Sequence, residues 1–284
     1  MEKLIRASRI AYGIMMAGLA IQQIFYVTFR PVILPPWPSS LPGYAIGVYL
    51  FSGYLIVTGI AIIINKKARM ASLILGGILL LLFVFCQIPY EIIADPNNKN
   101  LGSWSGALKE LALAGGAFIV AGSFPIGREN EPQGYFMTSL LEKIIPFGSV
   151  FFSIMLICFG IDHFLFAEWI GTLVPNWIPF HIFWAYFAGV ALIGSGIAII
   201  LKIKLKLTAT LLALMIFLWF ILLHIPRGIA DPYGLQGNEI SSVLESFGFS
   251  GVAYLMAYGY HIKKNNLKSE SKGPDNILRV VKSA

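Results

Sequence analysis

Charged residues are scarce in this sequence, at 12% of 284 residues, whereas a soluble globular domain carries about 25%. Hydrophobic residues make up 57% of the chain. A soluble core of this length has no place for so much apolar surface, but a lipid bilayer does. The net charge of +7 does not indicate nucleic-acid binding, because the Lys and Arg residues stand in short clusters between long apolar runs.

Cysteine is scarce as well. Cys86 and Cys158 each lie inside an apolar run, and the sequence has no Cys-x-x-Cys pair. This excludes a disulfide framework and a thiol redox motif, and we interpret both residues as small buried side chains. The basic N-terminus resembles a signal peptide, but the apolar run after it continues to Phe29, which is too long for one. We therefore expect a retained first helix.

Long apolar runs dominate what is present. A spanning helix needs about 20 mostly apolar residues. Eight runs meet this length approximately, and they lie at 10–29, 44–64, 70–90, 107–123, 147–167, 181–201, 208–227 and 241–262. The sequence therefore predicts an all-α membrane protein with eight transmembrane helices. The segment Ile-Ala-Asp-Pro occurs twice, ending at Pro96 and at Pro232. In each case the proline predicts a turn that ends the helix.

The basic residues predict the orientation. Clusters of Lys and Arg precede the first span, fill the second and sixth loops and follow the last span, so they all lie on one side. The positive-inside rule makes this side cytoplasmic. We expect a multi-pass protein of the plasma (inner) membrane with both termini in the cytoplasm. The polar segment 124–146 is then a cytoplasmic linker, and 265–284 is a flexible basic tail.

The sequence repeats itself in two halves. YLFSGYLIVTGIAIII from Tyr49 matches YFAGVALIGSGIAIIL from Tyr186, and QIPYEIIADP from Gln87 matches HIPRGIADP from His224. The offset is 137 residues in both cases (186 − 49 and 224 − 87). Each half has four spans, an even number, so the two have the same orientation. We predict two parallel four-helix-bundle repeats at 1–123 and 147–264.

Each half resembles a DoxX-like unit, a small four-helix membrane family. The second half carries the first-helix, loop and third-helix patterns of the family as Gly160-x-Asp162-His163-Phe164, Pro175-x-Trp177-x-Pro179 and His224-x-Pro226. The first half carries the fourth-helix pattern as Lys109-Glu110 followed by LALAGGA. The resemblance implies a link to membrane redox chemistry, because some relatives are similar to subunits of quinone-coupled sulfur oxidoreductases. The chain departs from the pattern where Gln23 and Gln87 replace histidines and Glu245 replaces the lysine.

Three of the four histidines fall at the same depth in the second half, near the predicted outer ends of their helices: His163, His181 and His224. Polar residues in a membrane are costly, so each raises a functional question. A neutral imidazole can hydrogen-bond a quinone carbonyl and pass on a proton. We therefore take His163 and His224 as candidate catalytic residues, with Asp162 or Asp231 orienting them.

Other residues near this end complete the candidate site. The candidates for binding the cofactor are Asp162, His181, Arg227 and Trp177. Arg227 is spaced for a local ion pair with Asp231, and Lys109 is expected to pair with Asp95 or Glu91. The alternatives are that the histidines only hydrogen-bond between helices, that two of them ligate a haem, or that three of them bind zinc.

Three functions follow from these features. The first is a redox-associated membrane subunit with a quinone site near the outer leaflet. The second is a non-catalytic scaffold or assembly partner for a redox or secreted protein, since no strong catalytic motif is present and the first half has glutamines in place of histidines. The third is a transporter, although the spans lack the Gly and Pro breaks near their middle that mark a substrate site.

Overall fold

The computed structural model describes residues 1–124 and 136–270, and for 136–138 and 259–270 it describes the backbone only. The first half contains α1 (Glu2–Tyr26), α2 (Tyr44–Ile63), α3 (Ala68–Leu82), the π-helices η1 (Phe83–Gln87) and η2 (Tyr90–Ala94), the short η3 (Leu101–Trp104) and α4 (Ser105–Ser123). The second contains α5 (Phe136–Glu142), η4 (Ile145–Phe147), α6 (Gly148–Leu165), α7 (Ala167–Leu173), α8 (His181–Ile200), α9 (Leu205–Trp219), the π-helix η5 (Phe220–His224), α10 (Ile225–Ala230) and α11 (Gly234–Glu270).

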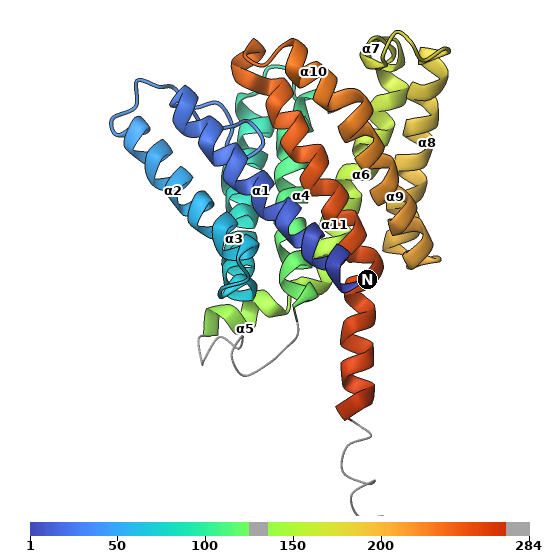
Figure 1. The fold of residues 1–284 in the computed structure, drawn as a ribbon. Coiled ribbons are helices and arrows are strands. Elements are labelled where there is room, and N and C mark those ends of the chain that lie inside the picture. The colour runs from blue at the N-terminus through green and yellow to red at the C-terminus, as the bar shows by residue number, and fades with distance from the viewer. Residues whose placement is uncertain (125–135, 271–284) are drawn as a thin grey trace, which may run out of the picture.

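The described residues form eight helices that are long and apolar enough to cross a membrane, which confirms the predicted all-α membrane fold. The observed spans differ from the predicted ones mainly at their ends. The first begins at Glu2 rather than at residue 10, and the fourth begins at Leu101 rather than at 107. Figure 1 shows the start of the chain and the end of α11 on one side of the bundle, here called the terminal side, and α7 and α10 on the other, the far side.

The repeat found in the sequence extends to the backbone. Helices α2 and α8 have the same length and are 137 residues apart at both ends (181 − 44 and 200 − 63). The same offset relates α3 to α9 and η1 to η5. Asn65 and Lys67 have positive φ angles in the loop before α3, as do Lys202 and Lys204 before α9. The two halves therefore share loop conformations as well as spans.

The two halves are interlocked. Helix α1 packs along α2 of its own half and α11 of the other, whereas it barely touches α4. Correspondingly, α6 packs along α8 of its own half and α4 of the other. Figure 1 shows α1 and α11 side by side. Helices α4 and α11 also contact each other, and they are the two most buried spans. They form the centre of the molecule, about which the halves are related.

Glycines allow the close approach between the halves. A methyl group added at Gly115 of α4 would lie 2.6 Å from the carbonyl oxygen of Gly148 in α6. At the matching position of α11, a methyl group on Gly251 would lie 2.7 Å from the carbonyl oxygen of Ser8 in α1. Backbone atoms give way less easily than side chains do, so both interfaces require a residue without a side chain.

We expect Gly115→Ala to lower the free energy of unfolding by about 1–3 kcal/mol, because overpacking forces the helices apart. Thermal unfolding of the detergent-purified protein measures this. Gly194→Ala in α8 is the matched control, because nothing lies within 4 Å of the added methyl group and alanine favours a helix more than glycine does. Equal melting temperatures for the two variants would contradict the packing argument.

The predicted turns at the two Asp-Pro pairs are confirmed. Helix η2 ends at Ala94 and Asp95 is extended, while α10 ends at Ala230. Asp95 accepts a hydrogen bond of 2.9 Å from the backbone N–H of Asn97. Hydrogen bonding to its charged form holds the pKa of Asp95 below its ordinary value. These turns close the far side of each half.

Candidate functional site

An ion pair joins the two central helices near the far side. Lys109 of α4 lies 2.7 Å from Glu245 of α11, with side chains 21% and 5% exposed. The two positions are 136 residues apart (245 − 109), as are Gly115 and Gly251 (251 − 115). Lys109 and Glu245 are therefore equivalent residues of the two repeats that meet at the axis relating them. Buried charges are stable when paired, and this pair holds the two halves together.

Two further acids are buried in the first half. Glu110 of α4 is fully buried, and neither carboxyl oxygen has a hydrogen-bond partner in the described part of the chain. It lies close to Gln87, at the end of η1. Glu91 in η2 is also buried, and its Oε2 has no partner among the described residues. Buried polar groups without partners are costly, so their presence points to function rather than to stability.

Arg30 anchors the irregular start of α11. It is 2% exposed, and its guanidinium donates hydrogen bonds of 2.7 Å to the carbonyl of Gln236 and 2.9 Å to Oγ of Ser241. Leu235, Gln236 and Gly237 have left-handed backbone angles, so their carbonyls are not all used within the helix. Burial lowers the pKa of Arg30, while the Glu245 carboxylate opposes the shift. Arg30 therefore adds a second buried cation near the central pair.

The second half holds His163 against an aromatic ring. His163 lies at the end of α6, and its Nδ1 is 2.7 Å from the carbonyl oxygen of Phe159. A carbonyl can only accept, so Nδ1 carries the proton and Nε2 of the neutral ring is left as an acceptor. The imidazole stacks on Trp219 at the end of α9, with ring centroids 6.3 Å apart and planes 17° apart. Lys109 lies 6.0 Å from the centroid of the Phe159 ring, so α4 reaches the same place.

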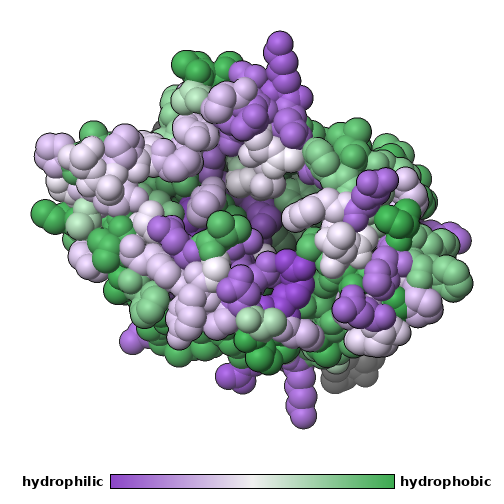
Figure 2. Space-filling view, turned by 90° about the horizontal axis from the view of Figure 1, so that it is seen from above, coloured by the Kyte–Doolittle hydropathy of each residue, from purple (hydrophilic) through white to green (hydrophobic). Residues whose placement is uncertain are grey.

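His224 is the last residue of the π-helix η5, five positions after Trp219. Its Nδ1 is buried and has no hydrogen-bond partner among the residues described. The charged groups of Lys109, Arg227 and Glu239 are near it. Figure 2 looks onto the far side and shows a hollow near the middle of that face, with hydrophilic residues inside it.

The π-helices have a local cause that is the same in both halves. A proline stands two residues after Gln87 and two residues after His224. Proline cannot donate to the carbonyl four residues before it, and its ring clashes with that carbonyl. A π-turn widens the helix at this point, and such turns are frequent at functional sites. The expectation from the sequence concerns Gly and Pro breaks only near the middle of the spans. The π-helices interrupt the spans nearer the far side, beside Pro89 and Pro226.

The glutamines of the first half form hydrogen bonds to residues outside their own helices. Gln23 donates a bond of 3.0 Å to Oγ of Ser52 and accepts one of 3.1 Å from the backbone N–H of Arg30. Gln87 donates a bond of 2.8 Å to the carbonyl of Pro31. They therefore tie the segment after α1 to the bundle. His224 forms no such bond among the described residues, so its buried Nδ1 has no hydrogen-bond partner there.

The other residues predicted for the site are more scattered. Asp162 is buried with Oδ1 unpartnered in the described part of the chain, but it makes no hydrogen bond to His163 there. Asp231 is exposed and accepts a bond of 2.9 Å from the N–H of Gly234. His181 lines an open depression of 430 Å³ at the start of α8, and Trp177 is 70% exposed. The described contacts thus join His163 to Trp219, and they place Lys109 near the Phe159 ring and near His224.

Two predicted ion pairs have different partners. Arg227 pairs with Glu239 of α11 at 2.6 Å rather than with Asp231. Lys109 pairs with Glu245 rather than with Asp95 or Glu91. In both cases the true partner belongs to α11, which passes through the centre of the molecule. Sequence reasoning also missed the role of Arg30, whose signal was an isolated cation just after the first span on a side without basic clusters.

Comparison of the chain with family models, with curated proteins and with solved structures finds no match. Among the described side chains, those of residues 1–124 and 139–258, no three His, Cys, Asp or Glu gather so that they could hold a metal ion. The site therefore has to be interpreted from its own chemistry. It combines the His163 imidazole stacked on Trp219, the buried Lys109–Glu245 ion pair, and a second imidazole, His224, close to the lysine of that pair.

Proposed function

We propose that this integral membrane protein binds a quinone or quinol at the far-side end of its second half and serves as a redox-associated subunit. The observation that carries the proposal is the stacking of His163 on Trp219, with the unpartnered Nδ1 of His224 five residues further along. An aromatic platform suits a planar ring, and ring nitrogens suit its oxygens. The resemblance to DoxX-like units supports the same chemistry.

The residues divide the work in this proposal. Nε2 of His163 accepts a hydrogen bond from a quinol hydroxyl, because Nδ1 is already bonded to Phe159. The second ring oxygen lies toward His224. Oxidation of a quinol to a quinone releases two protons and two electrons. The imidazoles take up the protons, and the electrons pass to a redox protein that associates with this one. The far side is then the outer side of the plasma (inner) membrane, with both termini in the cytoplasm.

We expect His163→Ala/His224→Ala to raise the dissociation constant for a short-chain quinone at least about tenfold, because both hydrogen-bonding groups are lost. Titration of the detergent-purified protein, followed by quenching of tryptophan fluorescence, measures this. The control is Gln23→Ala/Gln87→Ala, which removes the equivalent residues of the first half. If the histidine variant shows saturable quenching with the same midpoint concentration as the unaltered protein, the proposal is contradicted.

A second variant keeps the test valid if the alanine variant is unstable. His163→Gln/His224→Gln installs the residues that the first half has at these positions. Glutamine keeps the hydrogen-bonding capacity but cannot take up a proton. We expect this variant to bind the quinone while losing any dependence of binding on pH that the two imidazoles cause. An unchanged pH profile would exclude the histidines as proton acceptors.

A further inference from the structure

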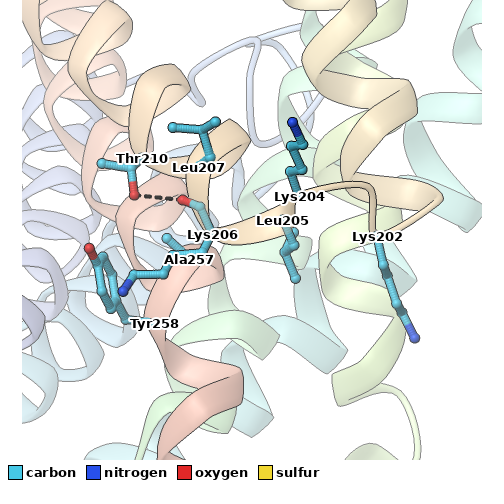
Figure 3. Close-up of a pocket in the computed structure, with 8 residues that line it drawn as sticks. All are labelled: Lys202, Lys204, Leu205, Lys206, Leu207, Thr210, Ala257 and Tyr258. Atoms are coloured by element: carbon cyan, nitrogen blue, oxygen red, sulfur yellow. Dashed lines mark hydrogen bonds between the residues drawn. The ribbon is translucent and has the colours of Figure 1, made fainter.

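A second site lies on the terminal side of the second half. An open groove of 690 Å³ runs between the start of α9, with the loop before it, and α11. Figure 3 shows the residues that line it, which come from that loop, from α9 and from α11: Lys202, Lys204, Leu205, Lys206, Leu207, Thr210, Ala257 and Tyr258. Three lysines therefore line a largely apolar groove at the end of the spans.

The equivalent groove of the first half is covered by another part of the chain. Arg69 stands at the position of Lys206 (206 − 69 = 137). It is buried and donates a hydrogen bond of 2.8 Å to Glu142 of α5 and another of 2.8 Å to the carbonyl of Ala121. Leu141 and Ile145 lie against the glycines of α3 and α4. The segment that covers this groove thus places the carboxylate of Glu142 beside Arg69 and apolar side chains against α3 and α4.

The second half presents the same chemistry without this cover. Lys206 lies 5.0 Å from the centroid of the Tyr258 ring. Within the part of the chain that the structure describes, none of the three lysines of the groove forms an ion pair. Leu207 is 54% exposed. The internal comparison therefore indicates a ligand that combines a negative head with an apolar chain.

We infer that this groove binds an anionic phospholipid, with its phosphate at the three lysines and an acyl chain along Leu205, Leu207 and Ala257. The groove lies at the end of the spans, where lipid headgroups are found, and basic pockets between helices bind such headgroups. The tail of the chain is a poorer occupant, because residues 265–284 have four Lys or Arg against two Asp or Glu. A basic tail is repelled by three lysines.

Native mass spectrometry of the full chain in detergent tests this with phosphatidylglycerol against phosphatidylcholine of the same acyl chains. We expect Lys202→Gln/Lys204→Gln/Lys206→Gln to weaken phosphatidylglycerol binding at least about tenfold and to leave phosphatidylcholine binding unchanged. The control is Lys3→Gln/Lys66→Gln/Lys67→Gln, which removes the same charge from exposed residues of the same side. Unchanged binding in the groove variant, or an equal loss in the control, would overturn the inference.

Two further arms identify the ligand. Inorganic phosphate at the same concentration should not displace the lipid, because the acyl chain contributes much of the binding. Displacement by inorganic phosphate would make the site one for free phosphate instead. A disulfide between Leu207→Cys and Leu278→Cys in lipid-free protein would make the tail the occupant and overturn the lipid assignment. The site is independent of the quinone proposal, so either can fail alone.

Discussion

Lys109→Met is expected to lower the free energy of unfolding by about 3–5 kcal/mol, because it leaves the carboxylate of Glu245 buried without its partner. The Glu245 side chain is only 5% exposed, so water cannot replace the ammonium group. Unfolding of the purified protein in a graded detergent mixture gives the free energy.

Two double variants test whether Lys109 stabilises the protein through its pairing with Glu245. In Lys109→Met/Glu245→Met both charges are gone, and an apolar pair of similar volume is often as stable as a buried ion pair. In Lys109→Glu/Glu245→Lys the charges are exchanged between equivalent positions of the two repeats. We expect both double variants to be more stable than Lys109→Met. If both are as unstable as the single variant, Lys109 acts through something other than Glu245.

The second large effect is expected at Arg30. Arg30→Met removes hydrogen bonds to the carbonyl of Gln236 and to Ser241, both of which belong to the irregular start of α11. Buried groups that lose a charged partner cost about 1–3 kcal/mol each, so we expect a loss of about 2–6 kcal/mol for the two groups. Hydrogen exchange at 235–241 should rise along with the loss of stability, because the left-handed turn is no longer held.

Arg227→Met is the matched control for Arg30. Arg227 also donates two hydrogen bonds, both to Glu239, but its side chain is 33% exposed. Water and salt screen a pair that is this accessible, and such pairs contribute about 0–1 kcal/mol. We therefore expect a change within about 1 kcal/mol for Arg227→Met. A loss as large as that of Arg30→Met would show that burial does not decide the difference.

Much of the fold could be predicted because bilayer thickness fixes the length of a spanning helix. The repeat could also be predicted, because Tyr49–Ile64 and Tyr186–Leu201 can be aligned residue by residue in the sequence. The same register anticipated that α2 and α8 have equal lengths. Lipid-facing and core-facing residues are both apolar, however. Hydropathy therefore says where helices cross, not which helices meet.

The packing across the halves was beyond the sequence for this reason. Gly115 and Gly251 could be identified as packing residues, but their partners, Gly148 and Ser8, depend on how the spans are arranged in space. The charges show the same limit. Lys109 has acids within its own half, so a local partner was the natural expectation, and the true partner, Glu245, lies in the other repeat.

The candidate site could be predicted in part. The histidines could be singled out because a polar residue in an apolar run is conspicuous, and His163 does stack on Trp219. Their environment depends on side-chain directions that a one-residue shift in helix register would change. The π-helix η5 makes such a shift at the residues that lead to His224.

The meeting of Lys109 and Glu245 has a consequence for why two such units are joined in one chain. A homodimer of one four-helix unit places the same residue on both sides of its axis. At this position it would bury lysine against lysine or glutamate against glutamate, and like charges in so dry a place repel strongly. A tandem chain lets each copy carry a different residue there. Covalent linkage thus gives this membrane protein an asymmetric centre that identical subunits cannot build.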